Sequence, residues 1–275
     1  MQPGYLARAS LTMFRHPLQG LERVRGRLDR RHDLRQLAMS ESAAPEIYQT
    51  VTDWEPRLHA MLGIDWPCDA AAEFQQRWSS LVDEVTATGA RFGLSSYARW
   101  SDGDVAFAGA IWCVIAHTRP TRVVETGVAH GVTSRIILEG LERNGQGDLY
   151  SIDLPAVDSN LRGEIGMAVP ERLRGRWTYV EGTTRSRLPS VLVELGEIDL
   201  FVHDSLHTGR NVRMELDRAW PVLRPGGVAV VDDVDHSFGF RTFLDSHEPL
   251  AWFTAPHVAG RGLFGLAIKP SLPSS

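Results

Sequence analysis

The sequence predicts an α/β fold built on a mostly parallel sheet with helices on both faces. From residue 104 onward, short apolar segments of strand length alternate with longer segments of helical spacing. Several of these strands end in acidic residues or glycines, as strands that lead into a ligand-binding edge do. The last two strands follow one another around a short turn, which predicts a closing antiparallel hairpin.

The chain length allows one large core and a smaller appended region. With 275 residues, 43% of them apolar, we expect a helical N-terminal extension over 1–100, used for oligomerisation or as a substrate cover, and a main domain over 101–275. Residues 1–40 hold eight arginines against three acids, with apolar residues at roughly helical spacing: Leu18, Leu21, Val24, Leu28 and Leu34. This pattern predicts one or two basic amphipathic helices docked on the domain or on a second subunit. The alternative is attachment to a membrane surface.

The remaining elements are expected in a regular order. A linker at 40–46 and a helix at 70–88 precede a loop-forming segment at 88–104 that is suited to cover a substrate. Helices are expected at 105–117, 134–143, 189–195 and 211–223, and strands at 122–125, 148–153, 177–181, 198–204, 227–232, 251–258 and 262–269.

Composition excludes several classes of protein. A net charge of -5 gives no reason to expect a nucleic-acid partner, which usually requires a basic face. Cys68 and Cys113 are too few for a disulfide framework and lack the sequence spacing of a zinc site, which fits a reducing cytoplasm. The first sixteen residues lack the apolar core of a signal peptide, and the longest apolar run, 106–116, is too short to span a bilayer, so we expect a soluble protein.

The most informative segment is TRVVETGVAHGVTS, at 121–134, in which a buried strand runs through an acid and two glycines into a helix. Gly127 and Gly131 allow a tight turn and a close approach of backbone to ligand. The spacing from Glu125 is E-x-G-x-x-x-G, whereas a dinucleotide pyrophosphate needs G-x-G-x-x-G, and position 129 is alanine. The turn therefore favours a ligand without phosphates. The alternative is a strand, turn and helix whose glycines serve packing alone.

This segment resembles the first motif of the class I S-adenosylmethionine-dependent methyltransferases. The resemblance implies a Rossmann-like methyltransferase fold with a seven-stranded sheet. Asp153, at the end of a strand 28 residues after Glu125, would accept the ribose hydroxyls. Further contacts to the cofactor are expected from residues near the adenine and near the methionine carboxylate: Gly182, Thr183, Thr184 and Arg185 for the first, and Thr133 and Ser134 for the second. His130 is expected to be an exposed loop histidine.

A second set of polar residues follows two later strands. Asp204 ends one strand, with His207 three residues on, and Asp232 and Asp233 end the next. Carboxylates at neighbouring strand ends repel one another unless a cation joins them, and an all-oxygen set suits magnesium, manganese or calcium. The alternative is that these acids cap turns. His203 is expected to be packed, because it points away from Asp204 along the strand.

The order Asp-x-x-His followed by an acidic pair resembles the metal-dependent O-methyltransferases of macrolide sugars and their cephamycin and rhamnosyl-lipid relatives, over about residues 104–270. The resemblance implies that Asp204, Asp232 and Asp233 hold Mg²⁺ or Mn²⁺, that Asp204 also borders the cofactor, and that His207 is the general base. Position 232 departs from the pattern, because the sugar enzymes have glutamate there.

The sequence thus predicts a metal-dependent O-methyltransferase that uses S-adenosylmethionine and acts on a hydroxyl of a glycoside or hydroxylated natural product. A vicinal diol is the expected acceptor, since two adjacent hydroxyls can share one hard cation. A homo-oligomer is expected as well. The alternatives are an NAD-dependent oxidoreductase and a noncatalytic binding protein that keeps the fold.

Overall fold

The computed structural model describes residues 17–40, 48, 50–89, 92–93, 96–97, 102–154, 156, 159–258 and 262–270, without the side chains of 17, 18, 159 and 160. Most of the predicted linker at 40–46, much of the segment 88–104 and the tip of the C-terminal hairpin lie outside the described residues.

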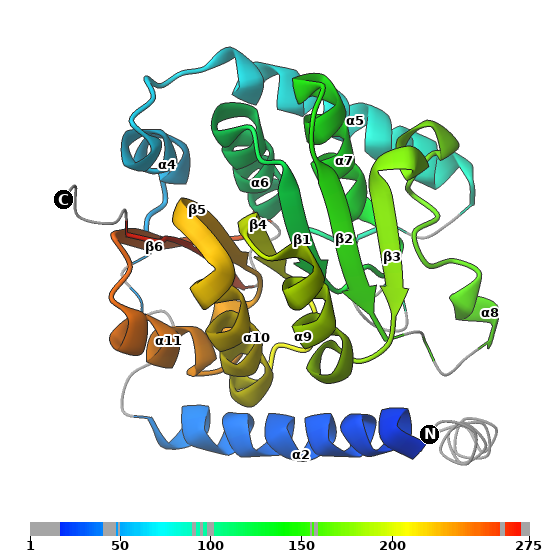
Figure 1. The fold of residues 1–275 in the computed structure, drawn as a ribbon, viewed down its shortest axis with the longest axis vertical. Helices are drawn as coiled ribbons and strands as arrows, with labels where there is room; N and C mark the ends of the chain where they lie inside the picture. The colour runs from blue at the N-terminus through cyan, green and yellow to red at the C-terminus, as the bar shows by residue number, and fades with distance from the viewer. Residues whose placement is uncertain are drawn as a thin grey trace.

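A seven-stranded sheet forms the centre of the molecule, with the strand order β3-β2-β1-β4-β5-β7-β6 (Figure 1). The strands are β1 (Arg122–Thr126), β2 (Asp148–Asp153), β3 (Trp177–Glu181), β4 (Ile198–His203), β5 (Leu223–Val231), β6 (Ala251–Pro256) and β7 (Leu263–Ile268). The first five are parallel, and β7 pairs antiparallel with both β5 and β6. The predicted fold class, with its closing antiparallel pair, is confirmed. Strand order reverses between β1 and β4, which is where open α/β sheets bind ligands.

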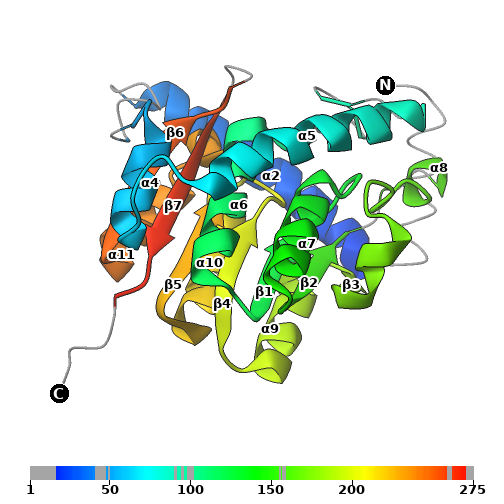
Figure 2. The ribbon, with the colours of Figure 1, turned by 90° about the horizontal axis from the view of Figure 1, so that it is seen from above.

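Alternating strand residues build two cores, one on each face of the sheet. Val123 and Leu200 face the core formed with α4 (Trp54–Leu62), α5 (Asp69–Ala87), α6 (Val105–Thr118) and α7 (Val132–Asn144). Val124 and Phe201, one residue on, face the core formed with α9 (Thr184–Leu195), α10 (Gly209–Val222) and α11 (Gly239–His247). Figure 2 shows these two helix layers on opposite sides of the sheet. The period of two between faces is what a strand covered on both sides requires.

The helix α9 begins five residues earlier than the predicted 189–195, so Thr184 and Arg185 lie in a helix and not in a loop. Thr183 caps this helix, because its side chain accepts a hydrogen bond from Ser186 N. Pro189 lies inside the helix and cannot donate to the carbonyl of Arg185. Arg218 Nη1 donates to that carbonyl instead, at 2.9 Å, so the proline leaves no unpaired acceptor.

The N-terminal region contributes a helix across the sheet edge and part of the core. The helix α2 (Pro17–Met39) runs across the ends of the strands in Figure 1, and α4, which the sequence analysis did not foresee, shares a core with α5 and α6. Leu21, Val24, Leu28 and Leu34 are all exposed, and the opposite, polar side of the helix faces the domain. The apolar face therefore does not dock on the domain, and its docking on a second subunit stays a prediction.

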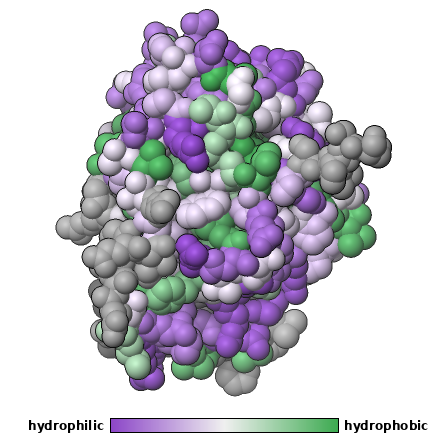
Figure 3. Space-filling model, turned by 90° about the vertical axis from the view of Figure 1, so that its left-hand side faces the viewer, coloured by the Kyte–Doolittle hydropathy of each residue, from purple (hydrophilic) through white to green (hydrophobic). Residues whose placement is uncertain are grey.

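Among the described residues, no helix is long and apolar enough to cross a membrane. Hydrophilic residues predominate on the face shown in Figure 3, and the hydrophobic residues that it shows form small separate patches.

Candidate functional site

The carboxyl ends of β1, β2, β4 and β5 meet at one edge of the sheet, and the residues that follow them remain in register. Asp204 N donates to Thr126 O at 2.8 Å, and Asp232 N donates to His203 O at 2.9 Å. The backbone pairing therefore continues one residue past the strand ends. As a result, the acids after β4 and β5 lie side by side, as the sequence predicted for neighbouring parallel strands.

The glycine turn after β1 packs tightly on the chain itself. Gly127 has a φ of +89°, and a β-carbon there would lie 1.8 Å from the carbonyl oxygen of Asp204. Gly131, at the start of α7, has a φ of +83°, and a β-carbon there would lie 2.8 Å from Gly166 Cα. Both positions thus require glycine for conformation and for space. Packing alone accounts for the two glycines, whether or not a ligand contacts them.

Glu125 is fully buried beneath this turn and is held by two hydroxyls. Its Oε2 accepts hydrogen bonds from Ser134 Oγ at 2.6 Å and from Ser151 Oγ at 2.7 Å. Burial raises the pKa of Glu125 to about 7, and the two hydroxyls oppose the rise. Its Oε1 has no hydrogen-bond partner among the described residues. Ser134 therefore positions Glu125, and Glu125 presents one buried acceptor that a donor group of a ligand can satisfy.

Asp153 extends from β2 towards the same turn. Its Oδ2 accepts a hydrogen bond from Ala129 N at 3.3 Å. Burial raises the pKa of Asp153 to about 6, while amides of the turn and the charge of Arg23 on α2 oppose the rise. A half-buried carboxylate beside the glycine turn is the arrangement expected for a nucleoside ribose.

The residues predicted beside the adenine serve mainly local structure. The hydroxyl of Thr183 caps α9, and Gly182 has a φ of +146°. Thr184 Oγ1 lies 3.5 Å from Asn211 Oδ1, and Arg185 Nε lies 3.3 Å from Glu22 Oε2 on α2. Thr133, on the methionine side, donates to Asp204 Oδ2 at 3.4 Å. Among these, Thr133 contacts the acidic set directly.

The acidic set forms one cluster with His207. Single ligand atoms of Asp204, His207 and Asp232 lie within 4.8 Å of one another, and His207 Nε2 lies 3.8 Å from Asp233 Oδ2. Burial raises the pKa of Asp204 well above its usual range, and the charges of Asp232, Glu125 and Asp233 raise it further. Burial and Asp232 likewise raise the pKa of Asp233 to about 8. Mutual repulsion of this kind is relieved by a bound cation.

His257 belongs to this cluster, although the sequence analysis did not single it out. Its Nε2 lies 2.9 Å from Asp232 Oδ1, and Asp232 with Asp233 raises its pKa to about 9 against the opposing effect of burial. The topology contains the signal: β6 runs antiparallel to β7 and β7 to β5, so the end of β6 lies at the same edge as the end of β5. His236 also contacts the cluster, 3.3 Å from Asp233 Oδ2.

Two other histidines are buried with carboxylate partners outside this cluster, although the ring of His203 packs edge to face on that of His207, with centroids 5.6 Å apart. His203 is packed as predicted, fully buried, with Nδ1 2.7 Å from Glu215 Oε2. The expectation of an exposed His130 is wrong, because its side chain is 1% exposed and its two ring nitrogens contact Asp102 and Glu164. Burial lowers the pKa of His130, but the two carboxylates together raise it above its ordinary value. His130 thus ties the glycine turn to two neighbouring segments.

The helix α2 covers the edge through polar contacts. Asp33 Oδ2 accepts a hydrogen bond from Gly209 N at 3.1 Å, and Arg210 pairs with Asp29 at 3.0 Å. A β-carbon on Gly26 would lie 2.8 Å from Leu206 Cδ2, so this part of the helix lies directly against the loop that carries His207. The polar side of α2 therefore belongs to the walls of the site.

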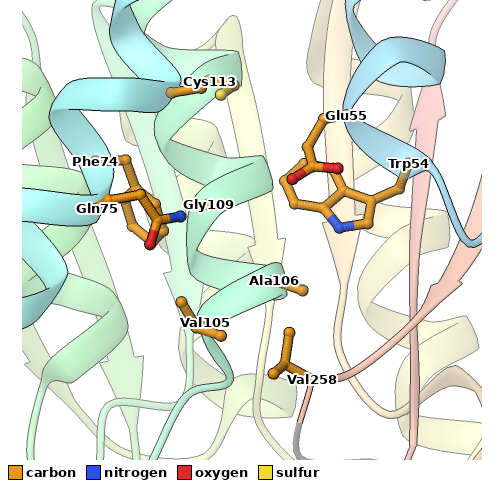
Figure 4. A pocket seen from close by; sticks show the side chains of 10 residues that line it. Trp54, Glu55, Phe74, Gln75, Val105, Ala106, Gly109, Cys113 and Val258 are labelled. Atoms are coloured by element: carbon orange, nitrogen blue, oxygen red, sulfur yellow. The ribbon is translucent and has the colours of Figure 1, made fainter.

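A recess lies between the N-terminal helices and α6 (Figure 4). Val105, Ala106 and Val258 line one end, and Cys113 lies at the other. Its walls are mostly apolar and aromatic. Val258 directly follows His257, so this end of the recess adjoins the acidic cluster.

Comparison with known proteins agrees with this geometry. Residues 124–234 match a family model described as a methyltransferase domain. Over these residues the chain is similar to a methyltransferase domain. An O-methyltransferase of Bacillus cereus solved with S-adenosylhomocysteine (13% identity, 79% of this chain and 97% of that one, TM-score 0.53) has a similar fold. So does TomG of Streptomyces achromogenes, an O-methyltransferase of tomaymycin synthesis solved with S-adenosylmethionine (15% identity, 80% and 97%, TM-score 0.52). No curated protein matches the chain.

The domain match and the fold confirm the predicted methyltransferase class. The match spans the glycine turn, Asp153 and the acidic residues after β4 and β5. The fold of this domain is the one that S-adenosylmethionine-dependent O-methyltransferases use.

Proposed function

We propose that this chain is a metal-dependent O-methyltransferase that transfers the methyl group of S-adenosylmethionine to a hydroxyl of a glycoside or hydroxylated natural product. The observation that carries the proposal is the convergence of Asp204, Asp232, Asp233 and His207 at the edge where the glycine turn and Asp153 also lie. The site for the methyl donor thus lies next to the residues that would bind and deprotonate the acceptor hydroxyl, as an in-line transfer requires.

The cofactor residues fit a nucleoside with an amino acid group. Asp153 faces the turn as a ribose acceptor, and Glu125 offers its unsatisfied Oε1 in the buried space beneath it. The amides at the start of α7 remain available for the methionine carboxylate. The proposed contacts to the adenine come from the segment after β3: Gly182, Thr183, Thr184 and Arg185. Its backbone groups would make these contacts more than its side chains, because the side chains cap α9 and pair with α2.

The acidic residues fit a divalent cation, with Asp204, Asp232 and Asp233 as its ligands. Three carboxylates held together with raised pKa values at two of them form an excess of negative charge that one Mg²⁺ or Mn²⁺ would offset. When bound, such an ion lowers the pKa of a coordinated hydroxyl and holds it for attack. His257 already pairs with Asp232 Oδ1, which leaves the other oxygen of that carboxylate for the metal.

His207 is the proposed general base. Burial lowers its pKa to about 3, which keeps the imidazole neutral at pH 7 but makes it a weak base, so its uptake of a proton depends on the carboxylates beside it. The charge of Asp232 opposes this effect, and Asp233 lies 3.8 Å away, so both carboxylates stabilise the imidazolium that forms when the hydroxyl proton is accepted.

The acceptor that we propose is a vicinal diol, and the test uses matched compounds. Purified protein is incubated with S-adenosylmethionine and a panel of sugars and catechols, and product is measured by mass spectrometry. For an accepted diol, the analogue that lacks the neighbouring hydroxyl should show a lower kcat as well as weaker binding. Chelation should abolish turnover and Mg²⁺ or Mn²⁺ should restore it, whereas Asp204→Ala should resist rescue.

The matched control is Asp217→Ala, which removes a carboxylate on α10 outside the cluster and should behave as the unchanged chain. Full turnover in excess chelator would refute the proposed metal dependence. Equal turnover of the deoxy analogue would refute the proposal that the acceptor is a vicinal diol.

We also propose that residues 1–100 cover the site and join two copies of the chain. Leu21, Val24 and Leu28 are exposed on the outer side of α2, at spacing that places them on one face. Light scattering should report a homo-oligomer that Leu28→Glu disrupts. Val193→Glu, at a still more exposed apolar position on α9, should leave the mass unchanged. A monomer that floats with anionic vesicles would favour the membrane alternative.

A further inference from the structure

Four potential metal ligands meet on the side of the molecule that carries α4, α5 and α6, away from the acidic cluster. His59 is in the last turn of α4, Cys68 immediately precedes α5, and Cys113 and His117 are in α6. Ligand atoms of His59, Cys68 and His117 all lie within 4.8 Å of one another. Cys113 and His117 are four residues apart and so lie on one face of α6.

The distances are close to those of a tetrahedral site. Cys68 Sγ lies 3.0 Å from His59 Nε2 and 3.3 Å from His117 Nε2. In a tetrahedron with ordinary zinc–sulfur and zinc–nitrogen bonds, sulfur and nitrogen ligands are about 3.5 Å apart. Small side-chain shifts of about half an ångström would therefore admit a zinc ion at this point.

The histidine orientation also suits a metal. His59 Nδ1 lies 2.7 Å from the carbonyl oxygen of Glu55, which can only accept a hydrogen bond, so the proton is on Nδ1 and the lone pair is on Nε2. That lone pair faces Cys68. Metal-bound histidines are commonly held in this way, with the other ring nitrogen donating to a backbone carbonyl.

The proposed fourth ligand is Cys113, which contacts the Cys68 thiol but is not among the three side chains whose ligand atoms all lie within 4.8 Å of one another. It is 2% exposed, and burial raises the pKa of its thiol, which the adjacent Cys68 thiol raises further. Figure 4 shows Cys113 on α6, at the end of the recess opposite Val105 and Val258. The His59 and His117 rings pack edge to face with centroids 5.1 Å apart, and Trp66 lies over His59 at 4.7 Å. The cluster is thus closed on several sides, as structural zinc sites are.

We propose that His59, Cys68, Cys113 and His117 bind one structural Zn²⁺ ion that fastens the N-terminal helices to α6. Binding releases the two thiol protons, and two thiolates with two neutral imidazoles make an uncharged complex suited to a half-buried position. The sequence did not show this site, because its ligands come as H-x8-C and C-x3-H separated by 44 residues of other structure.

The first test measures metal in the full-length chain purified with reductant and without chelator. Elemental analysis should find one zinc per chain. After replacement by Co²⁺, the spectrum should show the strong visible bands of a tetrahedral ion and a thiolate-to-cobalt band in the near ultraviolet. Absence of both zinc and a tetrahedral cobalt spectrum, or a Cys68–Cys113 disulfide that persists in the chain purified with reductant, would overturn the proposal.

Substitutions of the proposed ligands test where the zinc ion binds. Changes in outer-shell partners weaken metal binding by about 10- to 100-fold, so His117→Ala and Cys68→Ser, which remove ligands, should weaken zinc binding by about 100-fold or more. His117→Cys keeps a ligand and should retain the ion with a stronger thiolate-to-cobalt band, an outcome that a merely structural role for His117 would not give. The matched control is His247→Ala, which removes a histidine from the last turn of α11 and should leave zinc unchanged.

Asp232→Asn tests whether the acidic cluster is the zinc site. We expect this variant to retain the zinc. Zinc that is lost in Asp232→Asn and kept in Cys68→Ser would place the ion at the acidic cluster and refute the inference. Thermal unfolding with and without a strong chelator should show a lower midpoint for the metal-free chain, and this difference should vanish in Cys68→Ser.

Discussion

A single methyl group at Gly127 should disrupt the site more than its size suggests. Gly127 combines a φ of +89° with a potential β-carbon position 1.8 Å from the carbonyl oxygen of Asp204. Gly127→Ala therefore forces a side chain into the backbone of a proposed metal ligand, in addition to the strain of a left-handed residue. The same turn is held from the other side by the hydrogen bond from Gly127 N to Ile152 O, so it cannot move freely.

The magnitude follows from two separable contributions. Left-handed backbone costs alanine about 1–2 kcal/mol, partly offset by about 0.4–1 kcal/mol from the reduced entropy of the unfolded chain. Overpacking against a fixed neighbour adds about 1–3 kcal/mol. We therefore expect Gly127→Ala to lower the free energy of unfolding by about 2–4 kcal/mol. Gly145, with a φ of +70° and open space around its potential β-carbon, is the matched control that carries the strain alone.

The assay is urea unfolding of both variants, with calorimetric titration of S-adenosylmethionine into each folded protein. Gly145→Ala should lose about 1 kcal/mol and bind the cofactor normally. Gly127→Ala should lose clearly more and bind more weakly, because the displaced strand ends carry the site. Equal losses in the two variants would show that the contact with Asp204 relaxes without cost, and the reasoning from close packing would fail.

Further predictions address single residues of the site and its surroundings. Asp153→Ala should weaken S-adenosylmethionine binding by about 1–3 kcal/mol, the scale for removing one partner of buried polar groups, and unchanged affinity in calorimetry would remove Asp153 from the site. His207→Ala should retain cofactor and metal but lower kcat by about 100-fold or more; a collapse of metal affinity would instead make His207 a ligand. The pKa of His130 is raised in the folded chain, so its stabilising effect is complete below its unfolded pKa of about 6.5 and is lost as pH rises through the folded value. The destabilisation caused by His130→Gln should therefore be larger near pH 6 than near pH 9, and a pH-independent difference in urea unfolding would contradict the ionic role.

The strands, and the edge at which their carboxyl ends form the site, were predictable from the sequence. A strand that is buried on both faces appears in the sequence as a short run of apolar residues. Runs such as VVE, SID and VAVV, each ending at glycines or acids, identified β1, β2 and β5 to within one residue at their carboxyl ends. Parallel strands place their carboxyl ends together, so the meeting of Asp204 and Asp232 followed from topology alone. The same reasoning, extended to the antiparallel pair, would have found His257.

The capping of α9 was harder to predict from the sequence. It gives a structural role to residues that the sequence analysis expected to contact the cofactor. Glycine and threonines after β3 suggested a loop around the cofactor, yet Thr183 caps α9 and Pro189 is accommodated within it, because Arg218 satisfies the carbonyl that the proline cannot. A proline in a helix is ordinarily a sign of its beginning or end. The compensating arginine comes from α10, 29 residues away, and no local pattern reports it.

The helix α2 shows why periodicity alone does not tell which side of a helix faces the domain. Its leucines predicted an apolar stripe docked on the domain or on a second subunit, but the surface of the domain that it covers is an edge of strand ends and helix starts, which offers amides and charges more than apolar area. Asp33 accepts the amide of Gly209 at the start of α10, and Gly26 lets Leu206 approach closely because it has no side chain. A helix laid across such an edge is oriented by the polar groups that need partners there. The apolar residues are consequently left outside, where they can bury surface only against a second molecule.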